Sequence, residues 1–369
     1  MWGVAAVIED ERAYWIVLIM AAGIGPVRFQ RLLEVCGSAR GAWEATDLEL
    51  AAAGVERRTA ESLRRLRQRT APDAVGRRLA QLGIRAITLL DDGYPTNLRD
   101  VADPPPVLFV RGRLAARDAR AVALVGTRRA TSYGQAVADR LARELAAAGV
   151  TVVSGLARGV DTAAHRAVVQ AGGRTIAVLG NGLDQVYPPE NAGLARQIVE
   201  NDAGAVVSEF APGVRPDAVN FPRRNRLISG LSLGTVIVEA GEHSGALITA
   251  DFALEQGRDV LAVPGSIFGP MSAGTNELLR QGATPVTCAQ DILEAIGATP
   301  AEATTLAQHL PELGAREGCV LEALSAEPHH ADELARTLRL SSGEVAAALA
   351  MLELKGLARQ VGSMLYTRA

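Results

Sequence analysis

The sequence has 369 residues, of which 48% are hydrophobic and 21% charged, with a net charge of −3 and a mean hydropathy of +0.13. A chain of this length is expected to form two or three domains, and the composition excludes a disordered or fibrous protein. The cysteines are few and widely spaced, which excludes a disulfide framework and a Cys-rich zinc module.

No stretch approaches the roughly 18 apolar residues that a membrane helix requires. The nearest, residues 15–27, contains two glycines and a proline and follows a cluster of charged residues. We therefore expect neither a membrane span nor a signal peptide, and we expect the protein in the cytoplasm.

The basic residues are almost all arginines, and the only lysine is Lys355. A Walker A loop needs a lysine against the phosphates, and a Schiff-base enzyme needs one in its pocket. Neither chemistry is available upstream of residue 355. We expect no bound cofactor and no metal ion.

Residues 1–83 are predicted to form a small helical domain with glycine-containing hinges. The run Gly23-Ile24-Gly25 between two helices is similar to the turn of a helix-hairpin-helix motif, whose amides can approach a phosphate because glycine permits close contact. A helical bundle with an ordinary glycine turn fits the pattern equally well, so a DNA contact by this turn stays open.

Residues 84–297 alternate short apolar runs with amphipathic helices, which predicts a doubly wound, mostly parallel α/β sheet of the extended Rossmann type. A ligand of such a sheet binds beyond the carboxyl ends of its strands. The predicted strands are 86–90, 107–111, 121–126, 151–154, 175–180, 205–209, 235–239 and 260–263, and the main helices are 133–148, 161–171, 191–201, 224–230, 244–256 and 275–282.

The last part of the chain is predicted to be a linker, residues 298–315, followed by a winged-helix domain, residues 316–369. Three short helices, 317–324, 331–338 and 343–356, precede a hairpin. The third helix offers only Lys355, with Arg359 just beyond it, and the domain is net acidic. On these grounds a packing or protein-contact role is favoured over DNA binding, and both remain open.

Three strand-to-helix loops of the central domain combine glycines, hydroxyls and arginines in front of a helix. Free amides and the positive end of a helix dipole favour anions at such a position. Because all three loops follow parallel strands, they are expected along one edge of the sheet as a phosphate track. The candidate residues are Gly126, Thr127, Arg128, Arg129, Ser132, Gly155, Arg158, Ser244, Gly245 and Thr249.

The densest basic cluster, Arg223-Arg224-Asn225-Arg226, follows Phe221-Pro222 at the expected start of a helix. Arginines are disfavoured there by the helix dipole unless an anion is present, which suggests a ligand. The alternative is that some of them pair with Glu209, Glu239 or Asp217, above all Arg226. All four residues of the cluster are retained as DNA-binding candidates.

Asp161 and His165 lie four residues apart on one helix face and could resemble a pair of metal ligands. No third ligand has a recognisable spacing, so a hydrogen bond that orders the preceding loop is preferred. Base stacking would need aromatic side chains, which make up only 4% of the chain, and Tyr133 and Phe221 are the best placed.

Taken in order, these motifs closely resemble the DNA-processing protein A (DprA/Smf) family. The resemblance runs from about residue 84 to residue 285, and the flanks are similar to the family's helical N-terminal and winged-helix C-terminal domains. The segments that carry it are 125–128 with 132–134, 154–161 with 164–165, 182–184 with 187–188, 221–232 and 244–250.

The resemblance implies a non-enzymatic protein that binds and protects single-stranded DNA, forms a homodimer and loads RecA recombinase during natural transformation and recombination. The family's Gly-Ser-Arg phosphate motif falls on Gly126, Thr127 and Arg128, with threonine in place of serine. The basic residue of its Phe-Pro-x-Arg-Asn segment falls on Arg223. The dimer face and the RecA-contacting surface cannot be assigned from these motifs.

Two other readings of the sequence compete with this one. A Rossmann-type nucleotide enzyme similar to the phosphoribohydrolases would carry a Pro-Gly-Gly-x-Gly-Thr-x-x-Glu loop, but residues 241–249 lack its paired glycines and its glutamate. A chromosomal regulator acting through the winged helix would prefer duplex DNA over single strands.

Overall fold

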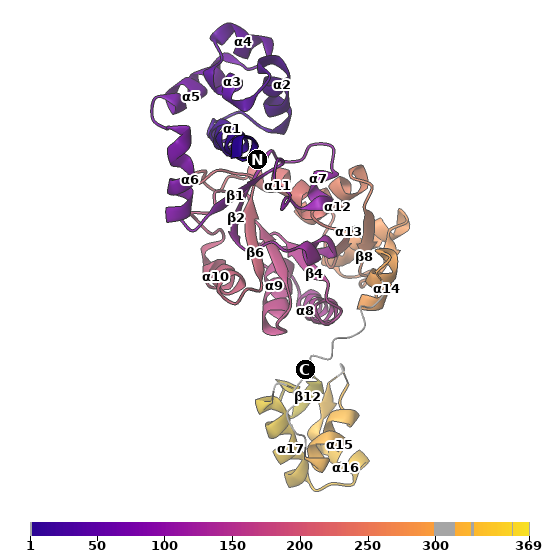
Figure 1. Ribbon diagram of the computed structural model, residues 1–369. Coiled ribbons are helices and arrows are strands. Elements are labelled where there is room, and N and C mark those ends of the chain that lie inside the picture. The colour runs from indigo at the N-terminus through magenta and orange to yellow at the C-terminus, as the bar shows by residue number, and fades with distance from the viewer. Residues whose placement is uncertain (1, 299–313, 326–327, 356, 369) are drawn as a thin grey trace. The chain divides into compact units, whose positions relative to one another are not determined.

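The computed structural model describes residues 2–298, 314–325, 328–355 and 357–368 of the chain. It divides into two compact units, one on each side of residues 299–313, and each is described by itself (Figure 1). Most of the expected linker 298–315 lies outside the described residues. Within the described ranges, no helix has both the length and the apolar character needed to cross a bilayer.

The first unit begins with six helices that pack against one end of the sheet (Figure 1). Their core includes an edge-to-face contact between Trp15 and Phe29, whose ring centroids lie 4.7 Å apart, and it continues into the core beneath strands β1 and β2. The helices are α1 (Trp2–Met20), α2 (Pro26–Cys36), α3 (Ala39–Glu44), α4 (Asp47–Ala52), α5 (Arg57–Arg67) and α6 (Pro72–Gln81).

A nine-stranded sheet with the order β1-β2-β6-β5-β4-β3-β7-β8-β9 forms the centre of this unit. The strands from β6 to β9 along this order run parallel, and only the β1–β2 and β2–β6 pairs are antiparallel. The strands are β1 (Arg85–Thr88), β2 (Val107–Gly112), β3 (Ala121–Val125), β4 (Thr151–Ser154), β5 (Thr175–Val178), β6 (Gly204–Ser208), β7 (Gly234–Ile237), β8 (Asp259–Ala262) and β9 (Thr284–Pro285).

Helices cover both faces of the sheet, because successive side chains of a strand point to opposite faces and both sets are apolar. Val122 and Leu124 of β3 pack on the layer of α8, α9 and α14, whereas Ala121, Ala123 and Val125 pack on the layer of α11 and α12. The helices are α7 (Thr96–Arg99), α8 (Ser132–Ala147), α9 (Val160–Gln170), α10 (Ala192–Glu200), α11 (Asn220–Gly230), α12 (Gly245–Glu255), α13 (Ala273–Arg280) and α14 (Ala289–Ala295).

This architecture confirms the predicted doubly wound, mostly parallel fold. Three of these strands and helices were not predicted from the sequence: the short helix α7, the edge strand β9 and the helix α14. A two-residue strand that contains a proline is too short to show any periodicity. Helix α14 begins where Asp291 accepts the backbone amides of Thr287 (2.7 Å) and Cys288 (3.1 Å).

The direction of winding reverses at β3. The chain builds β4, β5 and β6 on one side of β3 and then returns to its other side to add β7, β8 and β9. The loops that leave β3 and β7 therefore diverge, and a crevice opens between them at the carboxyl edge. This is the expected location for a ligand.

The second unit has the predicted winged-helix elements and, in addition, a short strand before its second helix. Ser341 and Glu344 form a capping box at the third helix, and Lys355 forms an ion pair of 2.5 Å with Glu317. The elements are α15 (Ala315–Ala323), β10 (His329–His330), α16 (Ala331–Leu338), α17 (Ser342–Leu354), β11 (Ala358–Gly362) and β12 (Leu365–Arg368), with the sheet order β10-β12-β11.

Candidate nucleic-acid interface

A cavity of about 680 Å³ occupies the crevice at the switch of winding direction, and we call it the switch-point pocket. Its walls come from the loops after β3 and β4, the crossover before α11, and the first turns of α11 and α12. Nine of the fourteen candidate residues line it: Gly126, Thr127, Arg128, Arg129, Arg224, Asn225, Ser244, Gly245 and Thr249.

The loop after β3 is tied closely to the neighbouring strand. The Thr127 amide donates to the Glu239 carbonyl at 2.7 Å, and the Thr127 hydroxyl accepts the Arg129 amide at 3.2 Å. A Cβ on Gly126 would lie 2.6 Å from a methyl carbon of Val160, so no larger residue fits there without displacement. The loop is thus fixed before any ligand arrives.

Glu239 is a buried carboxylate, and from the sequence it was expected only as a possible partner of the arginine cluster. It accepts the Thr131 amide at 2.9 Å and the Thr131 hydroxyl at 2.7 Å. Thr131 in turn caps α8 by accepting the Gly134 amide at 3.2 Å. Glu239 therefore joins β7 to the start of α8 and does not pair with the arginine cluster. The only sequence signal for this contact is a threonine in front of the helix.

Arg128 is exposed at the mouth of the switch-point pocket. Its guanidinium carbon lies 5.3 Å from the centroid of the Phe221 ring, and Phe221 stacks on Tyr187 with ring centroids 5.4 Å apart. Within the described part of the chain, no carboxylate lies within ion-pair distance of Arg128 or of Arg129. Their N–H groups are therefore free to bind an anion such as a phosphate. Tyr133, the other stacking candidate, lines a separate cavity.

Asp161 orders the loop after β4 through hydrogen bonds, which is the role that the sequence favoured over metal binding. Its buried carboxylate accepts the Gly155 amide at 3.0 Å and the Ala157 amide at 3.3 Å, and burial raises its pKa. His165 does not join it: Nδ1 lies 2.6 Å from the Thr175 hydroxyl, and burial lowers the pKa of His165 to about 3. No cluster of three potential metal ligands occurs among the residues described.

Arg224 lies beneath the pocket and is buried. Its guanidinium donates to the Gly155 carbonyl at 2.6 Å and to the Val178 carbonyl, which connects the ends of β4 and β5. Burial lowers its pKa to about 10, while the charge of Asp161 acts in the opposite direction. Arg224 therefore shapes the floor of the pocket. The sequence pattern alone could not separate this role from a surface contact.

Arg226 is also buried, in the ion pair with Glu209 that was considered as the alternative to DNA binding. It donates to the Glu209 carboxylate, and its Nη1 donates to the Asp103 carbonyl at 2.7 Å. These partners occupy the guanidinium, so the structure gives Arg226 an internal position in place of the expected surface contact.

The four remaining candidates also lie outside the switch-point pocket. Gly155 is buried against Arg224, and Ser132 is exposed at the start of α8. Arg158 is exposed but forms an ion pair with Glu190. Arg223 is exposed and without an ion-pair partner in the described chain, and it lines a second cavity on the other side of α11. Arg128 and Arg223 thus flank the first turn of α11.

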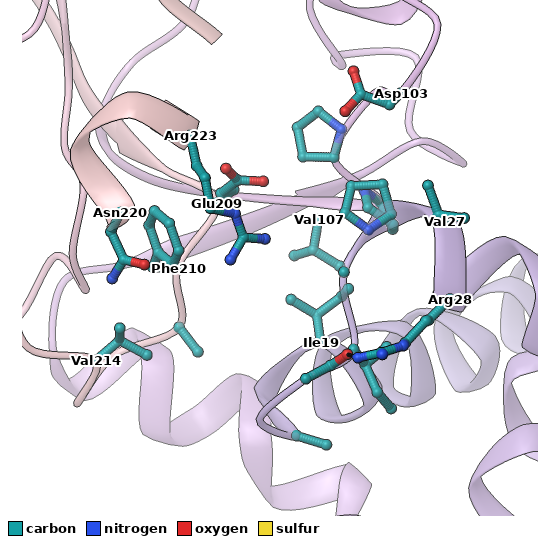
Figure 2. Close-up of a pocket in the computed structure, with 18 of the residues that line it drawn as sticks. Ile19, Val27, Arg28, Asp103, Val107, Glu209, Phe210, Val214, Asn220 and Arg223 are labelled. Carbon is teal, nitrogen blue, oxygen red and sulfur yellow. Dashed lines mark hydrogen bonds between the residues drawn. The ribbon is translucent and has the colours of Figure 1, made fainter. Parts of the chain in front are cut away.

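The second cavity, of about 730 Å³, lies between the Gly23-Ile24-Gly25 turn and the sheet, and we call it the junction pocket (Figure 2). Arg223 and Asn220 approach it from α11, and Val27 and Arg28 approach it from α2. No local sequence pattern indicates that Arg223 lies close to the glycine turn.

The fold and its pockets define a Rossmann-type protein with helical and winged-helix flanking domains and an arginine-bearing, glycine-lined site at its switch point. The family model of DNA recombination-mediator protein A matches residues 85–297. Models of the DprA-like N-terminal HHH domain and of the DprA winged helix domain match residues 9–67 and 304–363. The chain belongs to the DprA/Smf family of DNA recombination mediators.

Several relatives show how far this similarity extends. Protein Smf of Synechocystis sp. is 34% identical over 397 residues, which cover 98% of this chain and 99% of that protein. Protein Smf of Escherichia coli is 50% identical over 201 residues, or 54% of each chain. The crystal structure of DprA from Streptococcus pneumoniae superimposes with a TM-score of 0.66 at 37% identity, covering 76% of this chain and 97% of that one.

A structure of DprA from Helicobacter pylori, which concerns the single-stranded DNA binding mode of that protein, also superimposes. The TM-score is 0.51 at 32% identity, and the match covers 57% of this chain and 94% of that chain.

Proposed function

We propose that the protein binds the backbone of single-stranded DNA at the switch-point pocket and loads RecA recombinase onto the strand, without a catalytic step of its own. The observation that carries this proposal is the free guanidinium of Arg128 at the mouth of a rigid, glycine-lined pocket. The single-stranded DNA binding mode described for the Helicobacter pylori relative supports it. Such a role belongs in the cytoplasm, where recombination takes place.

The start of α12 supplies the second part of the proposed phosphate site. Ser244 caps the helix by accepting the Ala246 amide at 3.3 Å, and Gly245 is exposed with no atom within 4 Å of where its Cβ would lie. The remaining amides of this turn and the positive end of the helix dipole favour an anion. Because these contacts carry no base information, we expect little sequence preference from this pocket.

The absence of catalysis is inferred from what surrounds the pocket. The carboxylates of Asp161 and Glu239 accept amides of the pocket's own loops, and His165 is buried and neutral at physiological pH. These groups serve the fold, so they are not positioned to transfer protons to a ligand. This argues against the phosphoribohydrolase-like alternative.

We further infer that the protein acts as a homodimer and contacts RecA directly. The switch-point pocket of a single copy offers two exposed arginines, Arg128 and Arg129, and two linked copies would raise the affinity for one strand by binding it at two places. Light scattering with and without DNA measures the first part. The second is measured as a shorter lag before RecA filaments form on DNA already covered by a single-strand binding protein.

Gel-shift titrations with single-stranded and double-stranded oligonucleotides test the central proposal. Arg128→Ala is expected to weaken single-strand binding by about 1.5–3 kcal/mol, the range for a hydrogen bond to a charged group. Arg196→Ala, an exposed arginine of α10 outside both pockets, is the matched control and should bind like the wild type. Equal affinity of the wild type and Arg128→Ala, or a preference of the wild type for duplex DNA, would contradict the proposal.

A further inference from the structure

The junction pocket combines apolar walls with polar groups at two different depths. Ile19, Val107 and Phe210 contribute to the walls, and Glu209 and Arg223 lie on the side of the sheet and α11 (Figure 2). The cavity opens between two parts of the first unit that are far apart in sequence. Its lining is not used by the phosphate site at the switch point.

The inner part of the pocket contains an unsatisfied hydrogen-bond acceptor. One carboxylate oxygen of Glu209, Oε2, pairs with Arg226, while the other, Oε1, is buried and has no hydrogen-bond partner in the described structure. Burial raises the pKa of Glu209, and the positive charges of Arg226 and Arg223 oppose this effect. A buried acceptor without a partner is costly, so this position favours a ligand that brings an N–H donor.

The outer part of the pocket favours an anion. Helix α2 has eleven residues, starts after Gly25 with Pro26 in its first turn, and has no side-chain cap on its free amides. The Arg223 side chain extends to this turn: its Nη2 lies 3.7 Å from the position that a Cβ on Gly25 would occupy. A guanidinium and an uncapped helix terminus facing one another favour a phosphate.

The pocket thus favours a ligand with an anionic group at the mouth, an N–H donor in the inner part and a flat apolar surface between them. A nucleotide has all three. We propose that the junction pocket holds one nucleotide of the bound strand, with its phosphate between Arg223 and the first turn of α2 and its base donating to Glu209 Oε1. This inference rests on the proposed function and extends the strand over the first turn of α11.

The same groups give the pocket a base preference. The two carboxylates attract exocyclic amino groups, which adenine, cytosine and guanine carry. Thymine presents carbonyl oxygens on both sides of its single N–H, and these oxygens face the carboxylates unfavourably. The pocket therefore prefers a base with an amino group over thymine.

Filling the pocket tests the proposal without removing any contact of the fold. Val27 lines the pocket from α2 and is 57% exposed, so Val27→Trp can occupy the cavity. Affinity of the full chain for oligo(dA) is expected to fall at least about fivefold, since one stacked base is lost, and affinity for oligo(dT) is expected to fall less. Val35→Trp, on the same helix but outside the pocket, is the matched control.

Glu209→Gln tests the base preference. The amide keeps the shape of the side chain but adds a donor that can bind a thymine carbonyl, so the ratio of oligo(dA) to oligo(dT) affinity is expected to fall about tenfold. Because this change also weakens the pair with Arg226, thermal unfolding is measured in parallel. The fluorescence of a single 2-aminopurine in the strand gives a second readout, expected to change on binding to the wild type and to change less with Val27→Trp.

The outcomes separate this inference from the proposed function. If Val27→Trp and Val35→Trp both bind oligo(dA) like the wild type while Arg128→Ala does not, the nucleotide site is refuted and the phosphate site stands. If Val27→Trp reduces RecA loading at unchanged DNA affinity, the pocket binds a protein segment and the inference is wrong. If the wild type binds no single-stranded DNA, both proposals fail.

Discussion

The switch-point pocket and the junction pocket flank the same turn of α11, and each has an exposed arginine at its mouth and a buried arginine beneath it. Arg128 and Arg223 are exposed at the two mouths, whereas Arg224 and Arg226 are buried beneath them. The pockets differ in their acids: Asp161 accepts two loop amides, while Glu209 keeps one oxygen without a partner. Burial and hydrogen-bonding partners, and not residue type, therefore decide whether an arginine of this cluster builds a pocket or is free to bind a ligand.

Loss of a buried arginine is expected to destabilise the protein far more than loss of an exposed one. Arg226→Ala leaves Glu209 as a buried, unpaired charge and is expected to lower the free energy of unfolding by about 3–5 kcal/mol. Arg223→Ala, three residues earlier on the same helix, is expected to change it by no more than about 0.5 kcal/mol. Urea unfolding of the two variants measures both. Equal losses of unfolding free energy in the two variants would contradict a stabilising role of the buried pair.

A smaller effect on stability is expected from the protonation of His165, which is buried in α9. The pKa of His165 lies near 3 in the folded protein because of burial, below its ordinary value of 6.5. The unfolded chain therefore binds an extra proton between these values, so stability is complete above about pH 6.5 and falls as the pH drops towards 3.

The size of this pH effect is at most about 1.4 kcal/mol for each pH unit. The measurement is the difference in unfolding free energy between the wild type and His165→Asn at several pH values, which removes the contribution of other acids. A difference that stays constant from pH 7 to pH 4 would contradict the assignment of a buried neutral histidine.

The smallest effect compares the two exposed arginines with each other. Each neutralised phosphate on a single strand contributes about −0.7 to the slope of log affinity against log salt. Arg128→Ala and Arg223→Ala are each expected to make this slope shallower by about that amount, and Arg196→Ala to leave it unchanged. A change for Arg128→Ala alone would mean that the strand does not pass over α11.

The sequence predicted the central fold well because buried parallel strands are continuous apolar runs, as in β3 and β4. It predicted the start of α11 four residues late, because Asn220 and Phe221 resemble the preceding crossover and Pro222 is tolerated in a first turn. The three loops meet at one edge because parallel strands end there. Which arginines of α11 are buried depends on distant partners, the carbonyls of Gly155 and Val178 for Arg224 and the carboxylate of Glu209 for Arg226, and no local pattern reveals them.

The contact between Glu239 and Thr131 has a consequence for the direction of a bound strand. The positive end of α8 already faces a carboxylate of the protein itself, so an outside anion gains little there. The first turns of α12 and α2 contain no acidic residue, and no carboxylate of the described chain accepts one of their amides. In the proposed complex, a strand bound at the switch point therefore runs away from α8 and towards the helical N-terminal domain.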